Sequence, residues 1–191
     1  MTAAPSSARQ RILDVATDLF YREGIRAIGV DTIVEQSGVG KATLYRHFPT
    51  KEDLITAYLD EKEHDYWQQY DEVLVQHEGS PREQLLAFVD TVVARLLQPD
   101  YRGCTFLNAL AEFSDKEHSV HRHAVEHKLA LKKRLLQLSQ QAGASDPEML
   151  ADQLMLLING ALASVSTFGA TGPTSQLKPL ATQLIDQQIQ P

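Results

Sequence analysis

The sequence has few of the features that mark a secreted or a membrane-spanning protein. Its single cysteine, Cys104, excludes an intrachain disulfide and fits a reducing compartment. The first residues contain no apolar stretch of the kind that a secretory signal needs. The longest apolar run, residues 154–168, is interrupted by polar residues, so it is not expected to span a bilayer. We therefore expect a cytoplasmic protein with no membrane partner.

Patterns typical of β-strands and internal repeats are also missing. Apolar residues recur instead at helical spacing along the whole chain, between capping residues and glycines. The sequence therefore predicts an all-α fold of about nine helices. They are expected at about residues 8–23, 31–37, 41–48, 51–77, 81–98, 103–113, 115–142, 147–168 and 175–188.

The net charge of −7 is unevenly distributed along the chain. Residues 1–56 carry seven Lys/Arg and seven Asp/Glu, so the whole excess of acid lies in residues 57–191. A segment of zero net charge can still bind DNA when its cations gather on one face. The composition therefore does not exclude a nucleic-acid partner for the first part of the chain.

Residues 31–53 read as a short helix, a tight turn and a second short helix. Gly38 can adopt the positive φ that ends a helix, and Val39 supplies an apolar contact beneath the turn. In the second helix Leu44 and Phe48 are four residues apart, so they share its buried face. The other side chains are donors and cations on a helix of about two turns, which fits a DNA major groove.

The run from Thr43 to Leu54, with Tyr-x-His-Phe-x-x-Lys near its start, resembles the DNA-binding signature of the TetR family of bacterial transcriptional regulators. A first helix that ends at Gly24 and the Ser-Gly-Val turn at residues 37–39 match the same signature. The resemblance covers residues 7–58. It implies a three-helix helix-turn-helix domain at residues 1–56 and a larger helical domain for ligand binding and dimerisation at residues 57–191.

The resemblance also implies roles for individual residues of the helix-turn-helix. Base edges are the implied partners of Lys41, Thr43 and Arg46, and phosphates are those of Tyr45, His47, Lys51 and Thr32. Arg46 has the fork that binds guanine in a bidentate way, and Gly40 allows close approach of the backbone to DNA. Gly29 and Val30 stand where many relatives have a capping hydroxyl residue. A phosphate contact from such a cap is therefore not expected here.

The last two predicted helices, residues 146–168 and 175–188, have the apolar faces of an interface between two copies of the chain. In relatives this pair of helices forms a four-helix bundle across a two-fold axis. Two short recognition helices in a homodimer can read a palindrome whose half-sites lie about one helical turn, roughly 34–36 Å, or a multiple of it apart. An internal core position for these helices is the alternative.

A ligand site in the second domain would be lined by aromatic and apolar side chains with two polar anchors. The candidates are Trp67, Tyr70, Phe88, Val92, Phe106, Asn108, Leu110, Glu112 and Phe113. Each of these residues is also a candidate for ordinary core packing. Cys104 is a candidate redox sensor, although most lone cysteines are small core residues.

Four histidines between His118 and His127 are spaced so that pairs share a helix face, as in some metal sites. The two pairs point in different directions, so no metal or other cofactor is expected. The sequence as a whole predicts a ligand-released repressor of the TetR type. An activator of the same fold and a metal-dependent hydrolase that uses the His118–His127 cluster are the alternatives, and the hydrolase leaves residues 31–53 unexplained.

Overall fold

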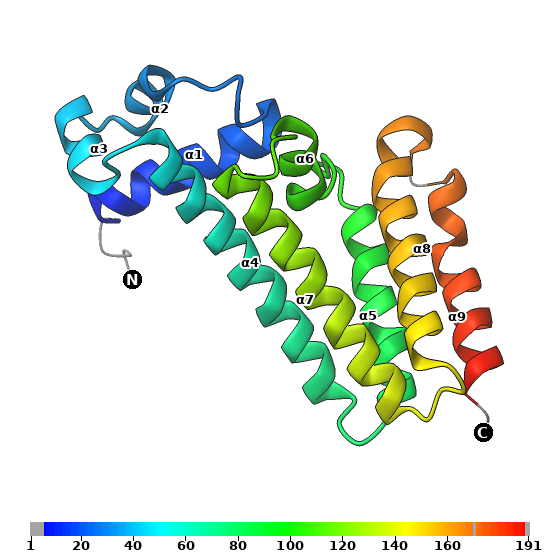
Figure 1. Cartoon of the computed structure of the whole chain (residues 1–191). Helices are drawn as coiled ribbons and strands as arrows, with labels where there is room; N and C mark the ends of the chain where they lie inside the picture. Colours follow the sequence, from blue (N-terminus) through cyan, green and yellow to red (C-terminus); the bar gives the residue numbers. More distant parts are fainter. Residues whose placement is uncertain (1–5, 170, 190–191) are drawn as a thin grey trace, which may run out of the picture. The chain divides into compact units, whose positions relative to one another are not determined.

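The computed structural model describes residues 6–169 and 171–189. Within these ranges every regular element is helical, which confirms the predicted all-α class (Figure 1). The elements are α1 (Ala8–Glu23), α2 (Val30–Ser37), α3 (Lys41–His47), α4 (Lys51–Gln76), α5 (Pro81–Leu96), α6 (Thr105–Glu112), α7 (Ser119–Gln141), α8 (Pro147–Phe168), the 3-10 helix η1 (Pro173–Gln176) and α9 (Leu177–Gln188). The start of the chain, where the sequence shows no secretory signal, lies outside the described residues.

The described residues form two compact units. The first unit extends to His64 and also contains Thr105–Ala124, whereas the second contains Asp65–Cys104 and the residues from Val125 onward. The helices α4 and α7 therefore contribute residues to both units. The units are defined by contacts in space, whereas the predicted domains are continuous segments of sequence. The domain division at residue 56 stays a prediction.

In the first unit α1, α2 and α3 pack against one another (Figure 1). Their core consists of apolar side chains that are almost completely buried, namely Ile12, Ala16, Leu19, Phe20, Ile33, Leu44 and Phe48. Tyr58 of α4 lies edge-on to Phe20, with ring centroids 5.6 Å apart. Helices as short as α2 and α3 are marginal in isolation, so this shared burial keeps them folded.

Local capping defines the ends of the helices in the first unit. The Ser7 hydroxyl accepts a hydrogen bond from the Gln10 N–H at 3.2 Å at the start of α1, and Gly24 ends that helix with a φ of 97°. At the start of α4, the Thr50 N–H donates to Asp53 at 2.9 Å and the Asp53 N–H donates to Thr50 at 3.1 Å. Thr50 and Asp53 therefore form a reciprocal capping pair at the start of α4.

In the second unit α5, α8, α9 and η1 pack together, and α5, α8 and α9 lie side by side in Figure 1. Their core includes Leu85, Phe88, Val89, Leu150, Leu154, Ile158, Ala181 and Ile185. Two ion pairs join α9 to α5, from Lys178 to Asp90 at 2.7 Å and from Arg82 to Asp186 at 2.5 Å. The helices of the second unit are therefore joined both by apolar contacts and by surface charges.

The helices α6 and α7 begin at Thr105 and Ser119, later than the expected residues 103 and 115. The helix α7 begins at Ser119, because Asp115 accepts a hydrogen bond from the Glu117 N–H at 3.0 Å and so holds a turn before the helix. Ser80 precedes α5, which begins at Pro81, but its side chain makes no capping hydrogen bond. A capping pattern in sequence can thus be satisfied by a turn, because Asp and Ser stabilise both structures.

Among the described residues, one helix, α8, is long and apolar enough to cross a membrane by the criteria of length and composition alone. The polar residues within it argue against a span, and 33% of the tested stretch is buried inside the structure. A core helix of a globular protein meets the same criterion, and α8 packs against α5, α9 and η1.

Candidate functional site

The α2–α3 pair is built around a glycine turn and a buried inner face. Gly38 follows α2 in the left-handed conformation, with φ 64° and ψ 21°. Val39 is buried directly after it, and Leu44 is fully buried on the inner face of α3, with Phe48 almost fully buried at the cap of that helix. Because the side of α3 that carries Leu44 packs against the core, the polar side chains of α3 lie on the remaining sides of the helix.

The outer side of α3 carries cations and an exposed aromatic ring. Lys41 and Arg46 are exposed, and the side chain of Tyr45 is 42% exposed. Thr43 and His47 are half-buried beside them. No ion pair engages Arg46 among the residues that the structure describes. Its guanidinium is therefore available to a partner outside the chain.

Lys41 is tied to the preceding helix by an ion pair. Its ammonium lies 2.6 Å from a carboxylate oxygen of Asp31 in the first turn of α2. The hydrogen bond from Lys41 to Asp31 and the charge of Asp31 raise the pKa of Lys41 above its usual value. Both side chains are exposed, so the pair adds little stability. A phosphate or a base edge can therefore compete with Asp31 for this ammonium.

Lys51 has a partner within the protein that the sequence did not indicate. Its ammonium donates to the Ile25 carbonyl at 2.7 Å and lies 5.7 Å from the centroid of the Phe20 ring. Burial lowers the pKa of Lys51, whereas the charge of Glu112 opposes this shift. Lys51 also occupies the first turn of α4, where unpaired N–H groups favour an anion. The predicted phosphate contact would therefore come from a lysine that also supports the loop between α1 and α2.

The remaining two residues predicted to contact DNA lie at the starts of α2 and α3. Thr32 is half-buried in the first turn of α2. The cap residue of this helix is Gly29, so no side chain caps it. Gly40 is exposed, its φ of −59° is open to any residue, and an added Cβ would meet no atom within 4 Å. Nothing in the fold around Gly40 requires a glycine, so contact with a partner such as DNA would account for the glycine at this position.

Two further contacts beside these helices carry no signal in the local sequence. The Arg9 guanidinium lies 5.0 Å from the centroid of the Phe48 ring. The Glu112 carboxylate accepts hydrogen bonds from the N–H groups of Ile25, at 3.0 Å, and Arg26, at 2.7 Å. Both contacts join residues far apart in sequence, so helical periodicity and capping patterns do not predict them.

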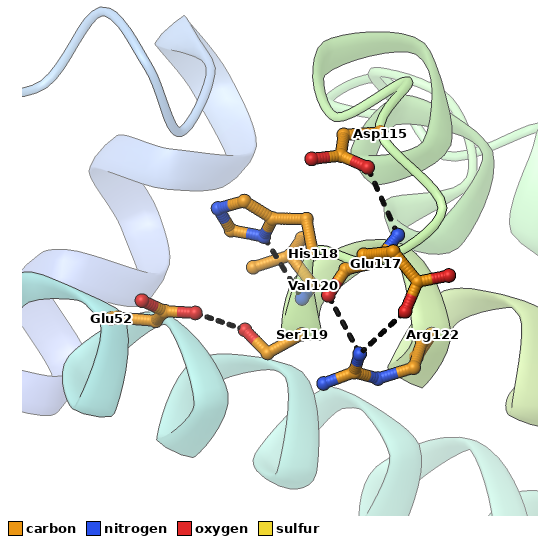
Figure 2. A network of polar contacts seen from close by, with 7 residues as sticks. All are labelled: Glu52, Asp115, Glu117, His118, Ser119, Val120 and Arg122. Atoms are coloured by element: carbon orange, nitrogen blue, oxygen red, sulfur yellow. Dashed lines mark hydrogen bonds and ion pairs between the residues drawn. The ribbon is translucent and has the colours of Figure 1, made fainter.

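Polar contacts also connect the start of α7 to α4, as Figure 2 shows. The Ser119 hydroxyl donates to the carboxylate of Glu52 in the first turn of α4. The Arg122 guanidinium donates to the Glu117 carbonyl at 2.6 Å, and His118 accepts the backbone N–H two residues on at 3.2 Å. The first turn of α4 is therefore fixed from α7 as well as from the α1–α2 loop.

Four of the predicted ligand residues belong to the second unit: Trp67, Tyr70, Phe88 and Val92. The Tyr70 ring contacts both Trp67 and Phe88, with centroids 5.8 Å and 5.2 Å apart, and Val92 is buried. His127, which is 1% exposed, lies 5.0 Å from the Trp67 ring. These side chains form an aromatic cluster, as their sequence positions suggested, and their role in ligand binding stays a prediction.

Cations cover part of this aromatic cluster. The Arg134 guanidinium lies 4.1 Å from the centroid of the Trp67 ring and 4.9 Å from that of Tyr70. Arg95 lies 4.9 Å from the centroid of Tyr66. Burial raises the pKa of Tyr70 to about 12, so its hydroxyl stays protonated at a pH where an exposed tyrosine has lost its proton.

The other five predicted ligand residues belong to the first unit: Phe106, Asn108, Leu110, Glu112 and Phe113. Phe106 stacks on His123 at a centroid distance of 6.4 Å, and the Arg26 guanidinium lies 4.8 Å from the centroid of Phe113. Asn108 and Leu110 are half-buried. The predicted ligand residues are thus divided between the two units, and the assignment of this second group stays a prediction as well.

The histidines of the predicted cluster have separate environments. His118 packs on the Phe113 ring at 4.6 Å, and a ring nitrogen of His121 lies 2.7 Å from the Phe113 carbonyl. His123 lies 3.2 Å from Glu63, whereas His127 is buried in the aromatic cluster. Among the described residues, no group of three or more His, Cys, Asp or Glu side chains is placed to hold a metal ion.

Comparisons with known proteins cover both parts of the chain. Residues 12–58 match the family described as bacterial regulatory proteins, tetR family, and residues 81–178 match the tetracyclin repressor-like C-terminal domain. HTH-type transcriptional regulators of Staphylococcus aureus are 48% identical over 46 residues. That match spans 24% of this chain and 25% of the length of those relatives.

Two solved structures resemble nearly the whole chain. A TetR-family transcriptional regulator from Streptomyces coelicolor is 33% identical, with a TM-score of 0.91 and coverage of 96% of each chain. A regulator of the same type from Streptomyces avermitilis is 32% identical, with a TM-score of 0.80, and the match covers 96% of this chain and 98% of that one.

Proposed function

Because the chain belongs to the TetR family of bacterial transcriptional regulators, we propose that it is a cytoplasmic repressor that leaves its operator when a small molecule binds. The observation that carries this proposal is the division of α3 into two faces. Leu44 is buried towards the core, whereas Arg46 and Tyr45 are exposed on the other side. A short helix with this division fits a major groove.

Direct reading of bases is assigned to Lys41, Thr43 and Arg46. Arg46 can form two parallel hydrogen bonds with guanine, which would make it the strongest determinant of sequence preference. Tyr45, His47, Lys51 and Thr32 are assigned to phosphates and fix the register of the helix without reading sequence. Gly40 would let the backbone approach the DNA, in keeping with the open space around it.

The proposed homodimer forms through residues 146–168 and 175–188. Along α8 the side chains Met149 and Leu156 are 42% and 75% exposed, and the exposed small residues Gly160 and Ala163 continue the same stripe. On α9, Leu180 is 42% exposed. An exposed apolar stripe of this kind is typical of an interface, and a two-fold dimer would present two recognition helices to a palindrome.

The proposed effector site uses the aromatic residues of the second predicted domain, residues 57–191. A small molecule that binds one arrangement of the protein more tightly than the DNA-binding arrangement shifts the population away from DNA. The aromatic cluster of Trp67, Tyr70 and Phe88 supports an effector with apolar or aromatic surface, because such rings favour stacking contacts.

Selection of bound sequences from a random DNA pool by the purified protein, repeated at several salt concentrations, tests the proposal. We expect a palindrome to be enriched and its affinity to fall steeply as the salt concentration rises. Enrichment of no sequence at any salt concentration contradicts the proposal. A reporter gene placed behind the recovered palindrome then separates repression from activation by the direction in which expression changes.

A further inference from the structure

We infer that Glu112 is a positioning residue for DNA recognition, because it holds the connection between α1 and α2 and thereby orients α2 and α3. This inference rests on the proposed DNA-binding function. It gives the carboxylate a role within the protein, whereas the sequence suggested that Glu112 anchors a ligand.

The two oxygens of Glu112 bind two consecutive backbone groups. Oε1 accepts a hydrogen bond from the Ile25 N–H at 3.0 Å, and Oε2 accepts one from the Arg26 N–H at 2.7 Å. Hydrogen bonds to a charged acceptor are stronger than neutral ones. The two N–H groups belong to the turn that leads directly into α2, which begins at Val30. The carboxylate therefore fixes the direction in which the chain enters α2.

Gly24 lies beside the Glu112 carboxylate and has a backbone conformation that favours glycine. A Cβ added at Gly24 would lie 3.4 Å from Oε1 and 3.5 Å from Oε2 of Glu112, and the φ of 97° at this position is one that other residues rarely adopt. The glycine that ends α1 is therefore favoured by the backbone of the turn, while a methyl group there would touch the carboxylate without a clash.

The backbone of Ile25 is also held by α4, through its carbonyl group. The Lys51 ammonium donates to the Ile25 carbonyl at 2.7 Å, while Glu112 accepts from the Ile25 N–H. The side chain of Ile25 is only 3% exposed, and the Arg26 guanidinium packs on the ring of Phe113, next to Glu112. The connection is therefore held at several points by the start of α4 and the end of α6.

The role is one of positioning because the helices have a core of their own. The helices α1, α2 and α3 pack against one another through side chains such as Ile12, Ile33 and Leu44, all fully buried. Removal of the Glu112 carboxylate should leave these contacts in place. It would release the turn at Ile25 and Arg26, so that α2 and α3 sample several orientations and only a fraction of molecules fit the DNA.

The test compares Glu112→Gln with Glu117→Gln in the full-length protein. Both substitutions remove one negative charge, but the side chain of Glu117 is 90% exposed and lies 3.8 Å from Arg122. Glutamine retains one acceptor oxygen and places an NH2 group opposite the second backbone N–H. We expect Glu112→Gln to bind the selected palindrome about tenfold more weakly, equivalent to about 1.4 kcal/mol. Glu117→Gln should bind within about twofold of the wild type.

Affinity is measured at a temperature at which circular dichroism shows every variant to be folded, since a purely structural role would lower only the melting temperature. Hydrogen exchange provides a second measurement: the Ile25 and Arg26 amides should exchange faster in Glu112→Gln, whereas the amide of Leu44 should not. Glu112→Asp, which keeps the charge with a shorter reach, should lie between glutamine and the wild type.

Several outcomes overturn the inference. Folded Glu112→Gln that binds DNA with wild-type affinity would overturn it. Equal losses of affinity in Glu112→Gln and Glu117→Gln would also overturn it, as would unchanged hydrogen exchange of the Ile25 and Arg26 amides. A wild-type protein that binds no selected DNA contradicts the proposed function itself, and the inference with it. The two failures are therefore distinguished by the behaviour of the wild type alone.

Discussion

Replacement of Gly38 by alanine should measure the energetic cost of the turn between α2 and α3. Gly38 has a φ of 64°, and an added Cβ would meet no atom within 4 Å. The penalty is therefore that of the left-handed backbone, about 1–2 kcal/mol for a residue with a Cβ. It is offset by about 0.4–1 kcal/mol, because alanine restricts the unfolded chain. We expect a net loss of about 1 kcal/mol in the free energy of unfolding.

Urea unfolding at one fixed protein concentration measures this loss, since the stability of a dimer depends on concentration. Gly38→Asn should lose less than Gly38→Ala, because asparagine visits the left-handed region more readily. Gly40→Ala is the matched control: the φ of Gly40 is −59° and its surroundings are open, so restriction of the unfolded chain is not opposed by a left-handed backbone and should raise stability by up to about 0.4–1 kcal/mol.

Three results would refute this reasoning about Gly38. A loss far above about 2 kcal/mol would mean that the new methyl group clashes with neighbouring atoms. Equal losses for alanine and asparagine would mean that backbone conformation is not the cause. Equal changes in stability for Gly38→Ala and Gly40→Ala would mean that the turn is not left-handed in solution.

Further substitutions test the proposed DNA contacts, the dimer and the aromatic cluster. Arg46→Ala should relax the sequence preference in competition binding on operator variants, whereas Tyr45→Phe should weaken binding to all variants alike; an unchanged preference profile in Arg46→Ala contradicts its assignment to bases. Leu156→Arg should shift sedimentation from dimer to monomer, whereas Leu129→Arg, at a leucine that is 60% exposed on α7, should not. Burial raises the pKa of Tyr70 to about 12, so between about pH 10 and 12 only the unfolded tyrosine has lost its proton, and the stability of the fold should decrease over this range. Tyr70→Phe should reduce this decrease. Equal dependence of stability on pH in the two proteins would contradict the prediction.

The helix-turn-helix could be predicted from sequence because its determinants are local. The left-handed glycine at position 38 and the four-residue spacing of Leu44 and Phe48 depend on neighbours within one or two turns. The capping pair Thr50 and Asp53 is equally local. Such features follow from steric limits and helical periodicity, which a single sequence displays directly.

The contacts that organise the surroundings of these helices could not be predicted, since they join distant residues. The hydrogen bonds of Glu112 to Ile25 and Arg26 and that of Lys51 to Ile25 pair a side chain with a backbone group. Every residue has these backbone groups, so the residue types in the sequence do not show which backbone group a side chain binds. The spacing of the histidines was equally uninformative, because residues that share a helix face can still meet different neighbours, as His123 and His127 do.

The contact between Glu112 and the turn at Ile25 has a consequence during protein synthesis. The two hydrogen bonds span 87 and 86 residues of sequence. At about 5–20 residues per second, the ribosome needs roughly 4–17 s to add the carboxylate after the turn has been made. During that interval the N-terminal helices can pack, but the Ile25 and Arg26 N–H groups lack their acceptor. A fragment that ends after residue 56 would stay in this unfinished state, and we expect it to bind DNA more weakly than its intact recognition helix suggests.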